Sequence, residues 1–79
     1  MVNVRYFAAA ADAAGTTAEQ FEPGTLAEVL AVMTERHGER LAEVVGRCSL
    51  LLDGAKVSDP ATVLTAGAKL DVLPPFAGG

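Results

Sequence analysis

The sequence predicts an α+β fold in which a mixed β-sheet packs against one main helix. Three observations indicate this: short segments of alternating apolar residues, one segment with apolar residues at helical spacing, and turn-forming Gly or Pro residues between them. The chain has 79 residues, of which 51% are hydrophobic and 20% charged, as is typical of one folded domain. Its stability should be modest, because so short a chain buries only about 60% of its unfolded surface.

The first part of the chain predicts two antiparallel strands with a short helix between them. Residues 2–7 alternate between apolar and mostly polar side chains, as a strand with one buried face does. Residues 8–14 are rich in Ala, the best helix former, and Gly15 would end this helix in a left-handed conformation. Residues 16–21 carry strand formers at both ends and predict the second strand, which a Pro-Gly turn follows.

The main helix should begin at Thr25. Thr25 and Glu28 have the spacing of a capping box, in which each side chain binds the backbone N–H of the other residue. The apolar residues that follow at helical spacing are Leu26, Val29, Leu30 and Met33. We expect His37, the only histidine, to face solvent near the end of the helix, which Gly38 would close. Residues 39–45 predict a looser helical turn.

The last part of the chain predicts three more strands. Residues 47–52 form the most apolar of these segments, so we expect this strand to be central in the sheet. A tight Asp-Gly turn and a short edge strand over residues 55–57 should follow. Residues 69–73 predict the last strand. This order of elements indicates the β-grasp, or ubiquitin-like, arrangement, in which the last strand lies beside the first at the sheet centre.

The sequence predicts a folded domain over residues 1–73 and an extended tail over residues 74–79, Pro-Pro-Phe-Ala-Gly-Gly. Pro74 and Pro75 restrict φ and favour an extended arm, and Phe76 offers an apolar anchor. Two glycines without Cβ atoms would let a terminal carboxylate enter a narrow channel in a partner. The alternative is a frayed chain end, which would not require stiffening prolines or an aromatic residue.

Composition excludes several other functions. The net charge of −4 argues against non-specific nucleic-acid binding, which requires a basic surface. Cys48 is the only cysteine, so an internal disulfide and a thiolate metal cluster are excluded; we expect it to be a buried structural thiol. We predict a cytoplasmic protein, with no secretory signal, membrane contact or metal site. No cluster of catalytic residues is evident, so the catalytic groups should belong to partners.

The chain resembles the MoaD-like small subunits of molybdopterin synthase, which are sulfur carriers related to the thiamine carrier ThiS. The resemblance covers the whole chain, and the Pro-Pro-X-X-Gly-Gly ending is its most specific part. The matching segments are residues 2–8, the Gly-Thr turn at 15–16, residues 64–70 and residues 74–79.

The resemblance implies chemistry at the carboxylate of Gly79. An activating enzyme of the ubiquitin E1 type would use ATP and magnesium to adenylate this carboxylate. Sulfur from a persulfide donor protein would then replace AMP and leave a thiocarboxylate. A MoaE-like large subunit would transfer that sulfur to a cyclic pterin precursor of molybdopterin. The chain would be the non-catalytic sulfur donor and bind no cofactor itself. The tail residues that would thread into the partner's active site are Pro74, Pro75, Phe76, Ala77 and Gly78.

The same resemblance makes Phe7, Val57 and Leu73 candidates for an exposed apolar patch that contacts partners. For Phe7 and Leu73, an ordinary position in the core is the alternative. Two other kinds of function stay open. The first is the same carboxylate chemistry with another outcome: a carrier for thiamine, cysteine or another sulfur product, or a protein conjugated to lysines. The second is a β-grasp interaction module without carrier chemistry.

Overall fold

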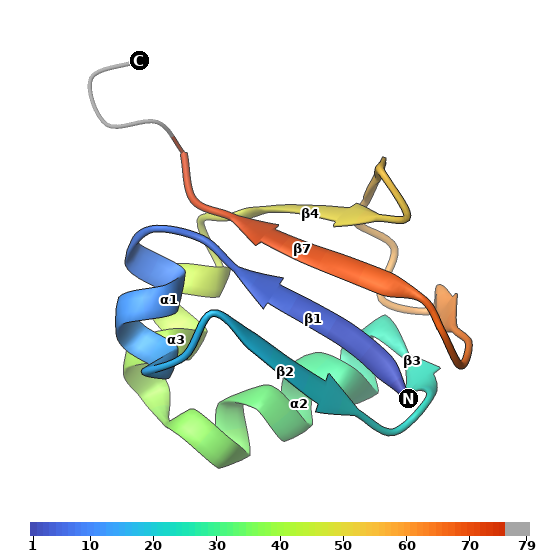
Figure 1. Cartoon of the computed structure of the whole chain (residues 1–79), viewed down its shortest axis with the longest axis horizontal. Coiled ribbons are helices and arrows are strands. Elements are labelled where there is room, and N and C mark those ends of the chain that lie inside the picture. Colours follow the sequence, from blue (N-terminus) through green and yellow to red (C-terminus); the bar gives the residue numbers. More distant parts are fainter. Residues whose placement is uncertain (76–79) are drawn as a thin grey trace.

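The computed structural model of the chain describes residues 1–75. A mixed sheet has the strand order β2-β1-β7-β4-β5, and helices pack against one of its faces (Figure 1). A small second sheet pairs β3 with β6. The elements are β1 Val2–Tyr6, α1 Ala9–Ala14, β2 Ala18–Phe21, β3 Gly24–Thr25, α2 Leu26–His37, α3 Glu39–Val45, β4 Ser49–Leu52, β5 Ala55–Val57, β6 Val63–Leu64 and β7 Lys69–Leu73. This architecture confirms the predicted α+β, β-grasp fold.

The last strand, β7, lies at the centre of the main sheet. It runs parallel to β1, with Val4 opposite Leu70, and antiparallel to β4, with Leu50 opposite Val72. The predicted pairing of the last strand with the first is therefore confirmed. The expectation that β4 is the central strand was wrong, because β4 lies between β7 and the short edge strand β5. The strand has apolar side chains on both faces, because Leu51 is half-buried on the face away from the helices.

The hydrophobic core forms between the helices and one face of the sheet. The predicted stripe of α2 faces inward, with Leu26, Val29 and Met33 buried and Leu30 packed against them. The buried strand residues on the same side alternate along β1 and β7, as a sheet with one buried face requires. They are Val2, Val4, Tyr6, Leu70 and Val72.

Local signals in the sequence fix the ends of several elements. At the start of α2, the Glu28 N–H donates to Thr25 Oγ1 at 3.2 Å, and the Thr25 N–H donates to Glu28 Oε1 at 2.9 Å. These two bonds are the predicted capping box. Gly15 ends α1 in the left-handed conformation, and Asp53 and Gly54 turn between β4 and β5, both with positive φ. Each of these predictions is confirmed.

Candidate functional site: the root of the tail

The chain leaves the main sheet from its central strand. Leu73, the last residue of β7, lies opposite Ser49 on β4. On the other side, the Phe7 N–H donates to the Val72 carbonyl at 3.2 Å. Neighbouring segments therefore hold β7 on both sides up to its end (Figure 1). The two prolines follow directly, Pro74 half-buried and Pro75 exposed. Because the strand is anchored in this way, the place and direction in which the chain enters Pro74 are fixed.

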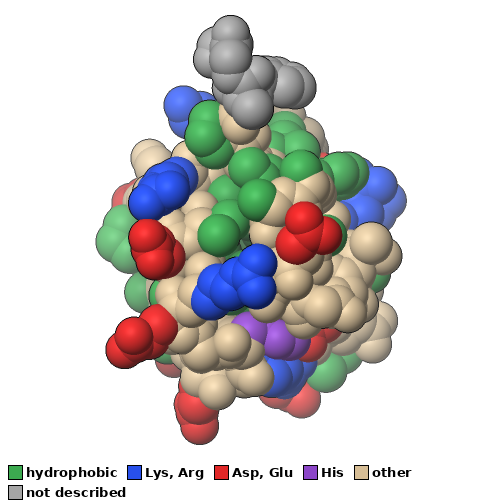
Figure 2. Space-filling view, turned by 90° about the vertical axis from the view of Figure 1, so that its left-hand side faces the viewer, with side chains coloured by type: hydrophobic (Ala, Val, Ile, Leu, Met, Phe, Trp, Pro, Cys, Tyr) green, Lys and Arg blue, Asp and Glu red, His purple; other side chains and the backbone are tan. Residues whose placement is uncertain are grey.

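Two hollows flank the prolines. The larger, of about 580 Å³, is lined by Phe7, Ala8, Ala9, Ser49, Leu73 and the two prolines, and we call it the tail-root groove. The smaller, of about 180 Å³, is lined by Ala9, Val44, Arg47 and the same prolines. Figure 2 shows hydrophobic side chains gathered in the upper part of the view, on the side of the molecule that lies to the left in Figure 1. Among the described residues that line the groove, Ser49 is the one with a polar side chain, so the groove suits an apolar protein contact better than a small polar ligand.

The structure brings Phe7 and Leu73 together in the tail-root groove. Both lie on the open face of the sheet, away from the helices, and the Phe7 side chain is 37% exposed. The alternative, that these two residues belong to the core, is therefore wrong. Pro74 and Pro75 line the same groove. Phe76, Ala77, Gly78 and Gly79, the other predicted residues of the tail, lie outside the described residues.

Val57 does not belong to this patch. It pairs with Leu50 across β4 and β5, and it packs against the core on the helix side of the sheet. The expectation that Val57 shares an exposed patch with Phe7 and Leu73 was therefore wrong, because this pairing register turns Val57 to the helix side. In a strand of three residues, alternation indicates two faces but does not reveal which one is buried.

We predict that Val57→Ala lowers the free energy of unfolding and leaves partner binding unchanged. The substitution removes two methyl groups from a half-buried side chain, which should cost about 1 kcal/mol. Urea unfolding and a binding titration on the same samples check both parts. Val63→Ala is the matched control, since Val63 is 65% exposed and should change stability by less than about 0.5 kcal/mol. Weaker binding at unchanged stability would instead place Val57 in the interface.

A charged pair borders the groove on the open face. The Arg5 guanidinium donates from Nε to Asp71 Oδ1 at 2.8 Å and from Nη2 to Asp71 Oδ2 at 2.9 Å. Its central carbon lies 5.5 Å from the centroid of the Phe7 ring. The hydrogen bonds and charge of Asp71 raise the pKa of Arg5. The sequence does not indicate this pair, because the pairing register of β1 and β7 cannot be inferred from it.

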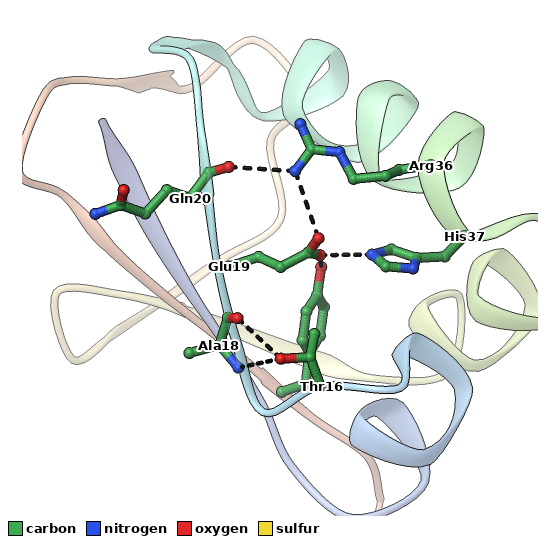
Figure 3. A network of polar contacts seen from close by, with 7 residues as sticks. Thr16, Ala18, Glu19, Gln20, Arg36 and His37 are labelled. Atoms are coloured by element: carbon green, nitrogen blue, oxygen red, sulfur yellow. Dashed lines mark hydrogen bonds and ion pairs between the residues drawn. The ribbon is translucent and has the colours of Figure 1, made fainter.

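A second polar cluster joins β1, β2 and the end of α2 (Figure 3). The Glu19 carboxylate accepts from the Tyr6 hydroxyl at 2.7 Å and from Arg36 at 3.4 Å, and its Oε1 lies 2.6 Å from His37 Nε2. The expectation that His37 faces solvent was wrong. His37 follows Met33 by four residues, so it continues the inward stripe of the helix, a signal that the sequence already contained.

The cluster of Tyr6, Glu19, Arg36 and His37 has a structural role, and we call it the clasp. Burial raises the pKa of Glu19, but the hydrogen bonds from Tyr6 and His37, with the charge of His37 and a bond from Arg36, outweigh it and lower the pKa overall. Burial is the largest cause of the raised pKa of Tyr6, and the hydrogen bond and charge of Glu19 raise it further. Glu19 is therefore ionised at neutral pH with its oxygens occupied by neighbours, so the cluster ties the edge strand β2 to α2.

We predict that the clasp makes stability depend on pH in the acid range. Because the pKa of Glu19 is lowered in the folded state from its ordinary 4.5, its contribution is present above pH 4.5 and is lost as the pH falls below that value. Glu19→Gln should lower the free energy of unfolding by about 1–2 kcal/mol at pH 7, with the deficit shrinking towards pH 3. Urea unfolding across this range measures it. Glu22→Gln, at an exposed carboxylate, should stay close to wild type, and a constant Glu19→Gln deficit would contradict the prediction.

Other candidate reactive groups are accounted for within residues 1–75. Cys48 is half-buried and donates from Sγ to the Val44 carbonyl at 3.1 Å, and burial raises the pKa of its thiol. This agrees with a structural role rather than a reactive one. No three His, Cys, Asp or Glu side chains gather as a metal site in this part of the chain. None of the helices found there is both long and apolar enough to span a membrane.

The β-grasp sheet, with a tail leaving its central strand beside an apolar groove, defines a ubiquitin-like protein. The comparison with family models agrees: the model described as the ThiS family matches residues 4–79. The chain therefore belongs to the ThiS/MoaD family of ubiquitin-like sulfur carriers. A comparison with curated protein sequences found no match.

Solved structures from several organisms share the fold. A complex of subunits 1 and 2 of molybdopterin-converting factor from Helicobacter pylori contains a chain that matches with 28% identity and a TM-score of 0.75, over 99% of this chain and 97% of that one. A proposed molybdopterin converting factor subunit 1 from Pyrococcus furiosus matches with 26% identity and a TM-score of 0.82, over 95% and 97%. SAMP1 from Haloferax volcanii matches with 22% identity and a TM-score of 0.83, over 99% and 98%, which shows the fold alone.

Proposed function

We propose that this chain is the sulfur-carrying small subunit of a molybdopterin synthase, with the carboxylate of Gly79 as its reactive group. The observation that carries the proposal is the anchored exit of the tail from the central strand, directly beside an apolar groove. This arrangement suits a protein that inserts its end into a partner while the groove contacts that partner. Similarity to subunit 1 of molybdopterin-converting factor supports the choice of acceptor.

The proposed reaction requires activation of the carboxylate, which is a poor electrophile. A carboxylate oxygen of Gly79 attacks the α-phosphorus of ATP on an E1-type enzyme, so that pyrophosphate leaves and an acyl-adenylate forms. A persulfide sulfur then attacks the carbonyl carbon, and AMP leaves. A thiol reduces the resulting S–S bond and frees the thiocarboxylate. ATP, magnesium, persulfide and thiol all come from partners, and this chain contributes the carboxylate and its delivery.

Two properties of the tail sequence support its delivery to a partner. Pro74 and Pro75 restrict the backbone as it leaves β7, so the tail starts in an extended direction at small entropic cost on binding. From Pro75, five extended residues can span roughly 16 Å, enough to pass from the surface of one protein into the active site of another. The activating enzyme and the MoaE-like large subunit would need the same tail, so they would bind in turn rather than together.

The experiment that tests the proposal follows the sulfur to its acceptor. The chain is incubated with its E1-type enzyme, ATP, magnesium and a persulfide donor, and the large subunit and cyclic pterin precursor are then added. We expect a thiocarboxylate to form and then to disappear as molybdopterin appears. A thiocarboxylate that the large subunit does not consume would favour a carrier for thiamine, cysteine or another sulfur product. Conjugation of the chain to lysines would favour a modifier, and no covalent change with active enzymes would overturn the carrier function.

A further inference from the structure

The open face of the main sheet is organised in rows of side chains. Strand register places one row across all five strands, and we call it the middle row: Ala18, Arg5, Asp71, Leu51 and Lys56. The next row away from the tail contains Gln20, Asn3 and Lys69. On the other side, the middle row adjoins the tail-root groove, because Arg5 and Asp71 each precede a groove residue by two positions on their strands. The apolar groove therefore continues directly into a polar surface.

This face has a different charge from the rest of the molecule. Its cations are Arg5, Lys56 and Lys69, and its carboxylates are Asp71 and, at the β4–β5 turn, Asp53, which accepts from the Lys69 N–H at 3.0 Å. Within residues 1–75, three cations against two carboxylates leave the face at +1. The whole chain carries −4, so the remaining surface carries −5. A weakly basic face on an acidic protein is complementary to an acidic partner surface.

Arg5 is the group on this face that is best placed to contact a partner. Asp71 uses two of the five N–H donors of the guanidinium and fixes its plane, which leaves three donors for another acceptor. The Arg5 side chain is 58% exposed, whereas that of Asp71 is 16% exposed. A guanidinium that is already oriented loses little freedom when it binds a second carboxylate.

We propose that the middle row determines the specificity of the tail-root interface, and that Arg5, positioned by Asp71, binds a carboxylate on an acidic surface of the large subunit. The inference rests on the proposed function, because the large subunit is the partner that would receive the tail. The Phe7 ring lies beside the Arg5 guanidinium, so one partner surface can cover the groove and the charged pair together. Apolar contacts in the groove would supply affinity, and the charged row would select the partner.

The first test compares Arg5→Gln with Arg40→Gln in calorimetric titrations of the cognate large subunit at low and high salt. Both substitutions remove one positive charge from an exposed arginine, but Arg40 lies on α3 rather than on the sheet. We expect Arg5→Gln to weaken binding about tenfold or more and to reduce its salt dependence, since Asp71 then faces the partner's carboxylate alone. Arg40→Gln should stay within about twofold of wild type. Thermal unfolding should show that both variants fold.

The second test uses Arg5→Lys and a carbodiimide, which joins an amine to a carboxylate by an amide bond with loss of water. We expect a cross-link between the introduced lysine and an Asp or Glu of the large subunit, identified by peptide mass spectrometry. Equal affinities for Arg5→Gln and Arg40→Gln, or no such cross-link in a complex that forms, would overturn the inference while leaving the proposed function intact. Failure of the wild-type chain to bind an active large subunit would overturn the proposed function, and the inference with it.

Discussion

Deletion of Gly79 should reduce thiocarboxylate formation at least about a hundredfold while leaving the fold unchanged. The deletion moves the terminal carboxylate back by as much as about 3.5 Å along an extended chain, and a misplacement of only about 1 Å can slow an enzymatic reaction by two orders of magnitude. Intact mass spectrometry after incubation with the E1-type enzyme, ATP, magnesium and a persulfide donor measures the result. The wild-type chain should gain about 16 Da, localised to Gly79 by fragmentation, as one oxygen is replaced by sulfur.

Gly79→Ala tests how the width of the tail affects the rate of thiocarboxylate formation when its length is unchanged. This variant keeps the length but adds a Cβ, so it should react more slowly than wild type and faster than the deletion if the partner's channel is narrow. Thermal unfolding of all three chains is the control for folding, and their melting temperatures should agree, because the core residues of the described chain lie between Val2 and Val72, before the tail. If the shortened chain gained sulfur as fast as wild type, the position of the carboxylate would not matter and the proposed delivery would be wrong.

Features set by neighbours in the sequence could be predicted well. The capping box at Thr25 and Glu28 and the inward stripe of α2 depend on residues three or four positions apart. The Asp-Gly turn depends on two adjacent residues. The central place of β7 followed from the order of elements and the handedness of crossover connections, since these leave few topologies for so small a sheet.

Features set by strand register could not be predicted. Arg5 and Asp71 are 66 positions apart in the chain, and only the parallel pairing of β1 with β7 makes them neighbours. The inward position of Val57 likewise depends on its pairing with Leu50, because a shift of one residue would turn it to the open face. His37 is a different case: its position four residues after Met33 indicated an inward side chain, and the half-buried Glu19 is the partner that lets its polar ring lie there.

Phe7→Ala should weaken binding of the large subunit about thirtyfold or more, the second largest effect we expect after loss of the tail's terminus. Phe7 forms the aromatic wall of the tail-root groove, and aromatic residues in a desolvated apolar pocket commonly dominate the binding energy of an interface. Because its side chain is already 37% exposed, its removal should affect folding much less than binding. Calorimetric titration measures the affinity, and urea unfolding measures the stability.

Val32→Ala provides the matched control for Phe7→Ala, because Val32 is an apolar residue of similar exposure, 42%, on α2 rather than at the groove. It should leave the affinity within about twofold of wild type. Leu73→Ala should weaken binding as well, but with some loss of stability, since Leu73 is half-buried at the end of the central strand. Equal effects of Phe7→Ala and Val32→Ala would contradict a groove-centred interface. Affinity would then reside in the tail alone, and the apolar wall beside it would have no part in binding the large subunit.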